Sequence, residues 1–161
     1  MNRTVVFFML LFLSGCSCEK KKGKPELLVI NVLDAELFND CHIKGSINVS
    51  FEQLEDFAKK LDKDTQIVIY CSNYQCTASF LGARMLKQMG FKNIWAYEAG
   101  MAGWFQSGLS LEGMCKQPYL TMKNVPLDME KESDIEIITT QDLQNKLMQT
   151  LTSAKAVACG Y

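Results

Sequence analysis

Apolar runs and amphipathic stretches alternate through the middle of this chain. Short apolar runs rich in β-branched residues predict buried strands, and they lie at residues 27–33, 47–49, 67–70 and 93–97. The stretches between them have helical spacing of apolar positions and predict helices over 35–39, 51–61 and 77–89, with another that opens at Gly100. Strands that alternate with helices predict an α/β fold with a central, mainly parallel sheet and right-handed crossovers.

Beyond residue 108 the pattern changes. Residues 115–126 are typical of irregular structure, and a charged turn at 130–134 precedes a short strand at 135–138 and a helix at 141–151. Leu143, Leu147 and Leu151 recur every fourth residue and form one apolar stripe, which predicts that this helix docks on a core. We therefore divide the globular part into a main domain, 27–108, and a C-terminal extension, 109–161.

The N-terminal 26 residues differ from the rest. Arg3 precedes an apolar core at 5–13, which is too short to span a bilayer and is typical of a secretory signal. The tetrapeptide that follows it, Leu13-Ser14-Gly15-Cys16, resembles the bacterial lipoprotein signal. The resemblance implies a signal peptide at 1–15, a lipid on Cys16 and a lysine-rich tether at 16–26. The domain would then be lipid-anchored to a bacterial membrane and face the periplasm or the cell exterior.

Composition narrows the classes of function. The 161 residues are 48% hydrophobic with a net charge of −1, which suits a globular protein and gives no basic excess for nucleic acid. His42 is the only histidine, and no closely spaced cysteine pair is typical of zinc, so we predict no metal and no cofactor. Outside the cytosol disulfides persist, and one pairing that we consider is Cys115 with Cys159. The cysteines besides Cys16 are Cys18, Cys41, Cys71, Cys76, Cys115 and Cys159.

Cys71 directly follows a predicted buried strand and stands before a predicted helix. Catalytic groups in α/β sheets often lie at this edge. We expect unpaired backbone N–H groups of the loop and the first helical turn to point at the Cys71 sulfur, which would lower its pKa and hold an anionic sulfur attached to it. The alternative is a buried, inert cysteine that packs as a small hydrophobe. The loop is made of Cys71, Ser72, Asn73, Tyr74, Gln75 and Cys76, and it leads to Thr77.

Three motifs, in order along residues 27–108, resemble the rhodanese-like domain family. They are Phe38 with residues 42–48, the strand that ends in Cys71, and residues 98–101 with Trp104. The resemblance implies a three-layer α/β/α sandwich and transfer of a sulfane sulfur through a persulfide on Cys71. Residues 72–77 would bind a small sulfur-containing donor, and a thiol would accept the sulfur. His42 would orient loops by hydrogen bonds, and Trp104 would close the core.

Some positions depart from the family pattern and leave other functions open. Tyr74 stands where many active members have glycine, and Cys76 stands where they have Arg, Ser or Thr. Leu33 replaces an arginine and Ala99 replaces a glycine, so groups that would bind an anionic donor are lost. Two alternatives to a sulfurtransferase follow: a catalytically weakened binding module, and a thiol-disulfide redox protein that uses Cys71 and Cys76.

The extension also has two interpretations. Domains of this family usually begin with a short strand, a Ser or Thr cap and a helix, which residues 17–26 cannot supply. The segment 135–151, with Thr140 as a cap, resembles that opening. It either completes the domain in a permuted order or begins a second, truncated rhodanese-like unit.

Overall fold

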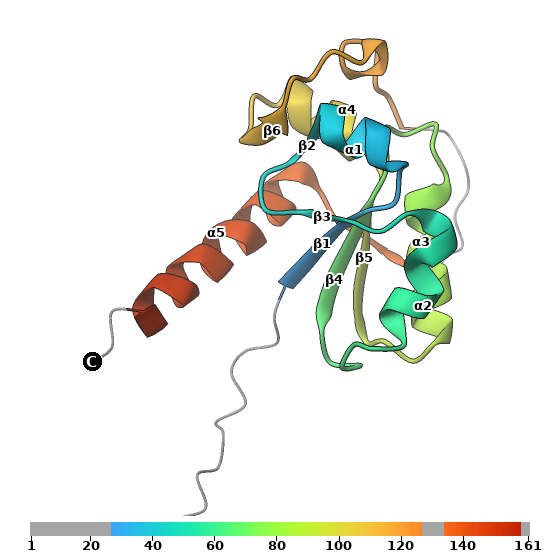
Figure 1. Cartoon of the computed structure of the whole chain (residues 1–161), viewed down its shortest axis with the longest axis vertical. Coiled ribbons are helices and arrows are strands. Elements are labelled where there is room, and N and C mark those ends of the chain that lie inside the picture. The colour runs from blue at the N-terminus through green and yellow to red at the C-terminus, as the bar shows by residue number, and fades with distance from the viewer. Residues whose placement is uncertain (1–26, 127–133, 159–161) are drawn as a thin grey trace, which may run out of the picture.

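A five-stranded parallel sheet forms the centre of the protein (Figure 1). The computed structural model describes residues 27–126 and 134–158. The strand order is β3-β1-β4-β5-β7. The strands are β1 (Leu27–Asn31), β3 (Ile47–Asn48), β4 (Gln66–Tyr70), β5 (Asn93–Tyr97) and β7 (Glu136–Ile137). A separate antiparallel pair joins β2 (Cys41–Ile43) to β6 (Leu111–Gly113).

Helices cover both faces of the sheet, which confirms the predicted three-layer α/β/α architecture. One face carries α2 (Leu54–Ala58), which follows the 3-10 turn η1 (Phe51–Gln53), and α3 (Ala78–Gln88). The other face carries α4 (Gly100–Gln106) and α5 (Thr140–Ala158). The remaining short helices are α1 (Ala35–Asp40) and η2 (Pro118–Leu120). No helix within these described residues is long and apolar enough to cross a membrane.

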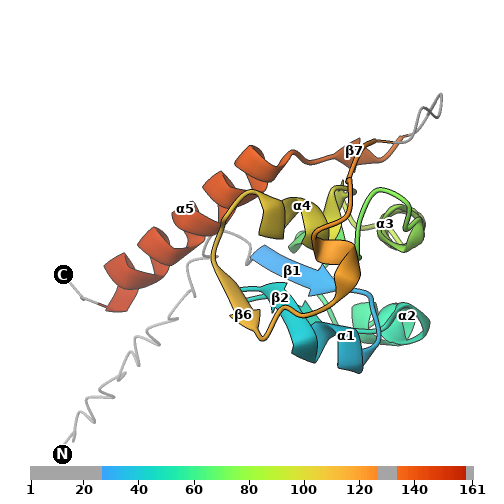
Figure 2. The ribbon, with the colours of Figure 1, turned by 90° about the horizontal axis from the view of Figure 1, so that it is seen from above.

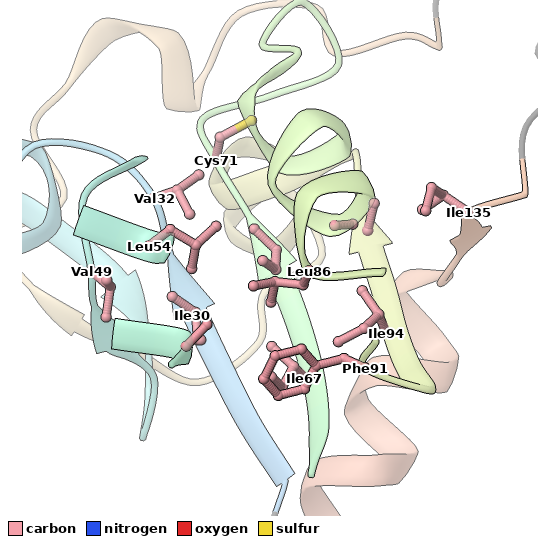
Figure 3. Close-up of a cluster of buried hydrophobic side chains, with 14 residues drawn as sticks. Ile30, Val32, Val49, Leu54, Ile67, Cys71, Leu86, Phe91, Ile94 and Ile135 are labelled. Carbon is pink, nitrogen blue, oxygen red and sulfur yellow. The ribbon is translucent and has the colours of Figure 1, made fainter. Parts of the chain in front are cut away.

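Alternation along the central strands divides the core into two clusters. Ile67 and Ile69 of β4 face α2 and α3, whereas Val68 and Tyr70 of the same strand face α4 and α5. All four side chains are fully buried, as expected for a parallel strand covered on both faces (Figure 3 shows the first cluster). The Tyr70 hydroxyl is satisfied in this interior, because it bonds the Ser46 hydroxyl at 2.8 Å.

The C-terminal extension belongs to the same sheet. β7 pairs with β5 in parallel, and the Ile138 N–H donates to the Ala96 carbonyl at 3.0 Å. Leu143 of α5 is fully buried, and α5 contacts β1. The permuted interpretation requires this contact with β1. The predicted apolar stripe is wrong at its end, because Leu151 is 64% exposed. Figures 1 and 2 show why: the second half of α5 runs past the edge of the sheet.

Residues 115–126, which we call the strap, cross the carboxyl ends of the strands (Figures 1 and 2). A disulfide between Cys41 and Cys115 fixes its beginning to β2, with the two Cα atoms 4.5 Å apart. The predicted Cys115–Cys159 pair is therefore wrong, and Cys159 itself lies outside the described residues. The Gln106 amide donates to the Leu120 and Met122 carbonyls at 2.9 and 2.8 Å. These contacts hold the strap against α4.

Two other sequence-based expectations change. The helix expected over 51–61 is a 3-10 turn followed by one short α-helix, and it ends at Ala58. The β2–β6 pair was not predicted, because three-residue strands carry too little alternation to be recognised. His42 in β2 agrees with its predicted structural role: its Nδ1 lies 2.9 Å from the Phe38 carbonyl and its Nε2 lies 3.2 Å from the Glu112 carboxylate. Trp104 is buried and donates to the Ser110 carbonyl at 3.0 Å.

Candidate active site

The backbone around Cys71 is fixed by the start of α4. The Cys71 carbonyl accepts the Met101 N–H at 2.9 Å, and the Ser72 carbonyl accepts the Ala102 N–H at 2.8 Å. Gly100 makes this close approach possible, because a Cβ built on it would lie 2.7 Å from both the Asn73 nitrogen and the Cys71 oxygen. Its φ of +60° also favours glycine. The sequence therefore positions the cysteine loop through backbone contacts rather than through side chains.

Cys71 lies at the end of β4, as predicted, but its side chain is fully buried. In Figure 3 its sulfur points away from Ile30 and Ile67, toward the loop and the start of α3. Its thiol donates to the Cys76 carbonyl oxygen at 3.1 Å, and the Ser79 hydroxyl, 3.4 Å from the sulfur, can donate to it. A carbonyl acceptor favours the protonated form of a thiol.

The second loop cysteine, Cys76, is partly exposed, and its carbonyl oxygen lies 3.1 Å from the Cys71 sulfur. The pKa of Cys76 is lowered to about 6: the interaction with Cys71 is the largest cause, the backbone N–H groups of Ala78 and Ser72 add to it, and burial opposes it. The interaction with Cys76 is the largest cause that raises the pKa of Cys71, and burial is the second. The negative charge of the pair therefore belongs on Cys76, and Cys71 keeps the proton.

This result corrects our expectation that the loop amides converge on the Cys71 sulfur. The Tyr74 N–H donates to the Asn124 side-chain oxygen at 3.1 Å. The Gln75 and Cys76 N–H groups donate to Asn73, at 3.2 Å to its side-chain oxygen and 3.0 Å to its carbonyl. The sequence shows how many backbone N–H groups a loop contains but not where they point. Here three of them donate to asparagine oxygens and not to the Cys71 sulfur.

The remaining predicted site residues lie around this pair with different exposure. Ser72 contributes both its hydroxyl and its N–H to Cys76. Gln75 and Thr77 are exposed, while Asn73 and Tyr74 are partly buried. Tyr74, which stands where many active members have glycine, does not have a positive φ; within the described part of the chain the only non-glycine residue with such a φ is Cys115. Cys16, the predicted lipidation site, lies outside the described residues.

Strap residues that sequence reasoning missed lie over the same site. Asn124 accepts from Tyr74 and donates to the Ala99 carbonyl at 2.8 Å, so it links the loop to the start of α4. Burial and the neighbouring Asp40 carboxylate raise the pKa of Tyr119 to about 12, and its buried hydroxyl has no hydrogen-bond partner. The hydrogen bond between Asn124 and Tyr74, and the proximity of Tyr119 to Asp40, each join residues far apart in the sequence. No local sequence pattern indicates such pairs.

A surface pocket of about 370 Å³ opens beside the loop, between the end of β1 and the start of α3. Its wall contains Ala78, whose N–H interacts with the Cys76 sulfur. It holds two carboxylates and no basic side chain, and it is lined by Val32, Leu33, Asp34, Phe51, Glu52, Thr77, Ala78 and Leu81. Among residues 27–126 and 134–158, no three His, Cys, Asp or Glu side chains gather in a way that could hold a metal ion.

The lowered pKa of Cys76 makes a prediction for alkylation. Because the thiolate is the nucleophile, the rate of Cys76 alkylation by iodoacetamide should rise with pH to a half-maximum near pH 6. In Cys71→Ala, which removes the largest cause of the lowering, the midpoint should move upward, toward the ordinary thiol value of about 8.5. Peptide mass spectrometry across a pH series measures both curves. An unchanged midpoint in Cys71→Ala would contradict this assignment.

Comparison with known proteins identifies the family. A rhodanese-like domain model matches residues 17–107. Among curated proteins, the thiosulfate sulfurtransferase GlpE of Shewanella oneidensis is 28% identical over 79 residues, which cover 49% of this chain and 76% of that protein. GlpE of Coxiella burnetii is 26% identical over 81 residues, which cover 50% of this chain and 74% of the relative.

Solved structures give the same result. BH2092 of Bacillus halodurans is 29% identical with a TM-score of 0.51, and the alignment covers 55% of this chain and 65% of that one. Alr3790 of Anabaena is 28% identical with a TM-score of 0.51, and the alignment covers 58% and 72%. The family match spans more than half of the sequence and includes the strand, loop and helix around Cys71. The chain therefore belongs to the rhodanese-like domain family.

Proposed function

We propose that this protein is a sulfurtransferase that carries a sulfane sulfur as a persulfide on Cys71. The observation that carries the proposal is the close approach of Cys71 and Cys76 at the carboxyl end of β4, where the Cys71 sulfur lies 3.1 Å from the Cys76 carbonyl oxygen. Curated relatives with the same domain are named thiosulfate sulfurtransferases. The pair supplies what the first step needs, which is a sulfur nucleophile with a base in contact with it.

Cys76 acts as that base in the proposed mechanism. With a pKa of about 6 it is a thiolate at neutral pH, and its carbonyl oxygen lies 3.1 Å from the Cys71 sulfur. As Cys71 attacks the outer sulfur of a donor such as thiosulfate, its proton passes to Cys76 and sulfite leaves. Cys71 then holds the persulfide anion, and the neutral Cys76 thiol can donate a hydrogen bond to it. Ser79, which lies 3.4 Å from the Cys71 sulfur, stabilises the same charge.

The proposal includes a location and partners. A lipid on Cys16 would hold the protein to a bacterial membrane, with the domain in the periplasm or outside the cell. The Cys41–Cys115 disulfide supports this placement, since structural disulfides persist in oxidising compartments. The partners would be a small sulfur donor and a thiol acceptor, and the near-neutral charge of the chain gives no reason to add nucleic acid.

One observation favours the weakened binding module as a second candidate. Cys71 is fully buried, and Asn124 of the strap occupies the Tyr74 N–H that an anionic donor would otherwise meet. The pocket beside the loop contains Asp34 and Glu52, which repel a dianion such as thiosulfate. A module of this kind would bind a sulfur ligand or a partner protein without forming a persulfide.

Sulfur uptake separates the two candidates. The full chain is incubated with thiosulfate and then cyanide, and thiocyanate is measured. We expect wild type to form thiocyanate and Cys71→Ser to fall to the rate without protein, because serine retains the shape but forms no persulfide. Equal unfolding midpoints would show that the variant is folded. If wild type forms no more thiocyanate than Cys71→Ser and also releases no hydrosulfide from the donor, the sulfurtransferase proposal fails and the binding module remains.

A further inference from the structure

A second reactive sulfur stands next to Cys71, and the proposed transfer uses it only as a base. Cys76 is partly exposed, and its carbonyl oxygen lies 3.1 Å from the Cys71 sulfur, so the two residues are in contact. N–H groups of Ser72 and Ala78 interact with the Cys76 sulfur. They stabilise a thiolate there, at the start of an eleven-residue helix. Cys76 is therefore placed to act as a nucleophile.

We propose that Cys76 attacks the persulfide on Cys71, releases hydrosulfide and leaves a Cys71–Cys76 disulfide. This inference rests on the sulfurtransferase function proposed above and gives that site a second step. The protein would then discharge its sulfur internally, and its co-substrate would be a dithiol reductant rather than a sulfur acceptor.

The step balances in atoms and electrons. After sulfur uptake, the proton on Cys76 returns to the outer sulfur of the Cys71 persulfide. The Cys76 thiolate then attacks the inner sulfur of Cys71, and the bond between inner and outer sulfur breaks with loss of hydrosulfide. The outer sulfur is reduced by two electrons, and the two cysteine sulfurs are oxidised to a disulfide. An external dithiol, which becomes a disulfide itself, returns both cysteines to thiols.

Burial of Cys71 favours this route over transfer to an outside thiol. Its side chain has no exposed surface, and the strap is hydrogen-bonded to the loop above it through Asn124. An external acceptor thiol would have to displace these contacts to reach the persulfide. Cys76 is already in contact with Cys71, so its effective concentration at the persulfide exceeds that of a dissolved thiol.

Mass spectrometry of the loop peptide tests the proposal. The full chain is loaded with a small organic persulfide in the absence of free thiol, quenched with an alkylating agent and cut with trypsin. Peptide 64–84 contains both cysteines of the pair and no others. For wild type we expect this peptide to have lost two hydrogens, together with a stoichiometric release of hydrosulfide. Cys76→Ser, and Cys76→Ala as a second variant, lack the proposed base and should load more slowly, so both are incubated with the persulfide until the peptide mass is constant. We then expect their peptide to have gained one sulfur and no hydrosulfide to be released.

The other outcomes are distinct. Retention of the added sulfur on the wild-type peptide, as in the Cys76 variants, overturns this inference and leaves the sulfurtransferase proposal intact. A disulfide that forms to the same extent without any donor overturns it as well, because the disulfide would not derive from the persulfide. Absence of added sulfur from every form, with no hydrosulfide released, overturns both proposals. With thiosulfate as the donor and dithiothreitol as the reductant, faster hydrosulfide production by wild type than by Cys76→Ser, each corrected for the rate without protein, is the final expected result, and equal rates would overturn the inference.

Discussion

Gly100→Ala is expected to destabilise the protein by about 2 to 5 kcal/mol and to abolish sulfur transfer. A Cβ at this position would lie 2.7 Å from the Asn73 nitrogen, the Cys71 oxygen and the Ser72 carbonyl carbon. These are backbone atoms of the cysteine loop, so no side-chain rotation can relieve the clash. The loop would have to move away from α4, and the pairing of Cys71 with Cys76 would move with it.

Gly108→Ala is the matched control for this prediction. Gly108 has a φ of +66°, close to the +60° of Gly100, but no atom lies within 4 Å of the position of its Cβ. It should therefore show only the backbone cost of about 1 to 2 kcal/mol and normal thiocyanate formation. Urea unfolding and the thiosulfate assay measure both variants. Equal losses in the two would show that close packing at Gly100 does not position the loop.

Much of the central sheet could be predicted from the sequence, because its strands are buried on both faces. The runs that end near Asn31 and Tyr70 are continuously apolar, and this pattern is specific to parallel strands covered by helices. The comparison with known structures and the observed sheet confirm the fold class. The β2–β6 pair and the strap could not be predicted, since long-range contacts without periodicity hold them in place.

The candidate site was predicted only in part. The sequence places Cys71 and Cys76 at the two ends of one loop, and the fold brings their thiols into contact. It does not show that Asn124 binds the Tyr74 N–H from fifty residues away. Nor does it show which sulfur is buried, and burial reverses the predicted charge distribution between the two thiols. Local position indicates Cys71 as the candidate nucleophile, whereas tertiary contacts decide its protonation.

Removal of the Cys41–Cys115 disulfide is expected to lower the free energy of unfolding by about 4 kcal/mol. The bond closes a loop with a sequence separation of 74 residues, and the loss of chain entropy that it imposes on the unfolded state has this magnitude. The double variant Cys41→Ala/Cys115→Ala should unfold at lower urea concentration. The beginning of the strap should also be held less firmly in this variant, and Cys71 should therefore be more accessible to solvent.

A reductant supplies the control for this variant. Dithiothreitol should lower the unfolding midpoint of wild type toward that of the double variant and should leave the double variant unchanged, because residues 27–126 and 134–158 then contain no disulfide to reduce. Cys71 should be alkylated faster in the double variant than in oxidised wild type, since Asn124 reaches the loop only while the strap is held in place. Faster alkylation with little loss of stability would mean that the disulfide mainly positions the strap. Loss of stability with unchanged alkylation would mean that Asn124 and Gln106 hold the strap in place without the disulfide.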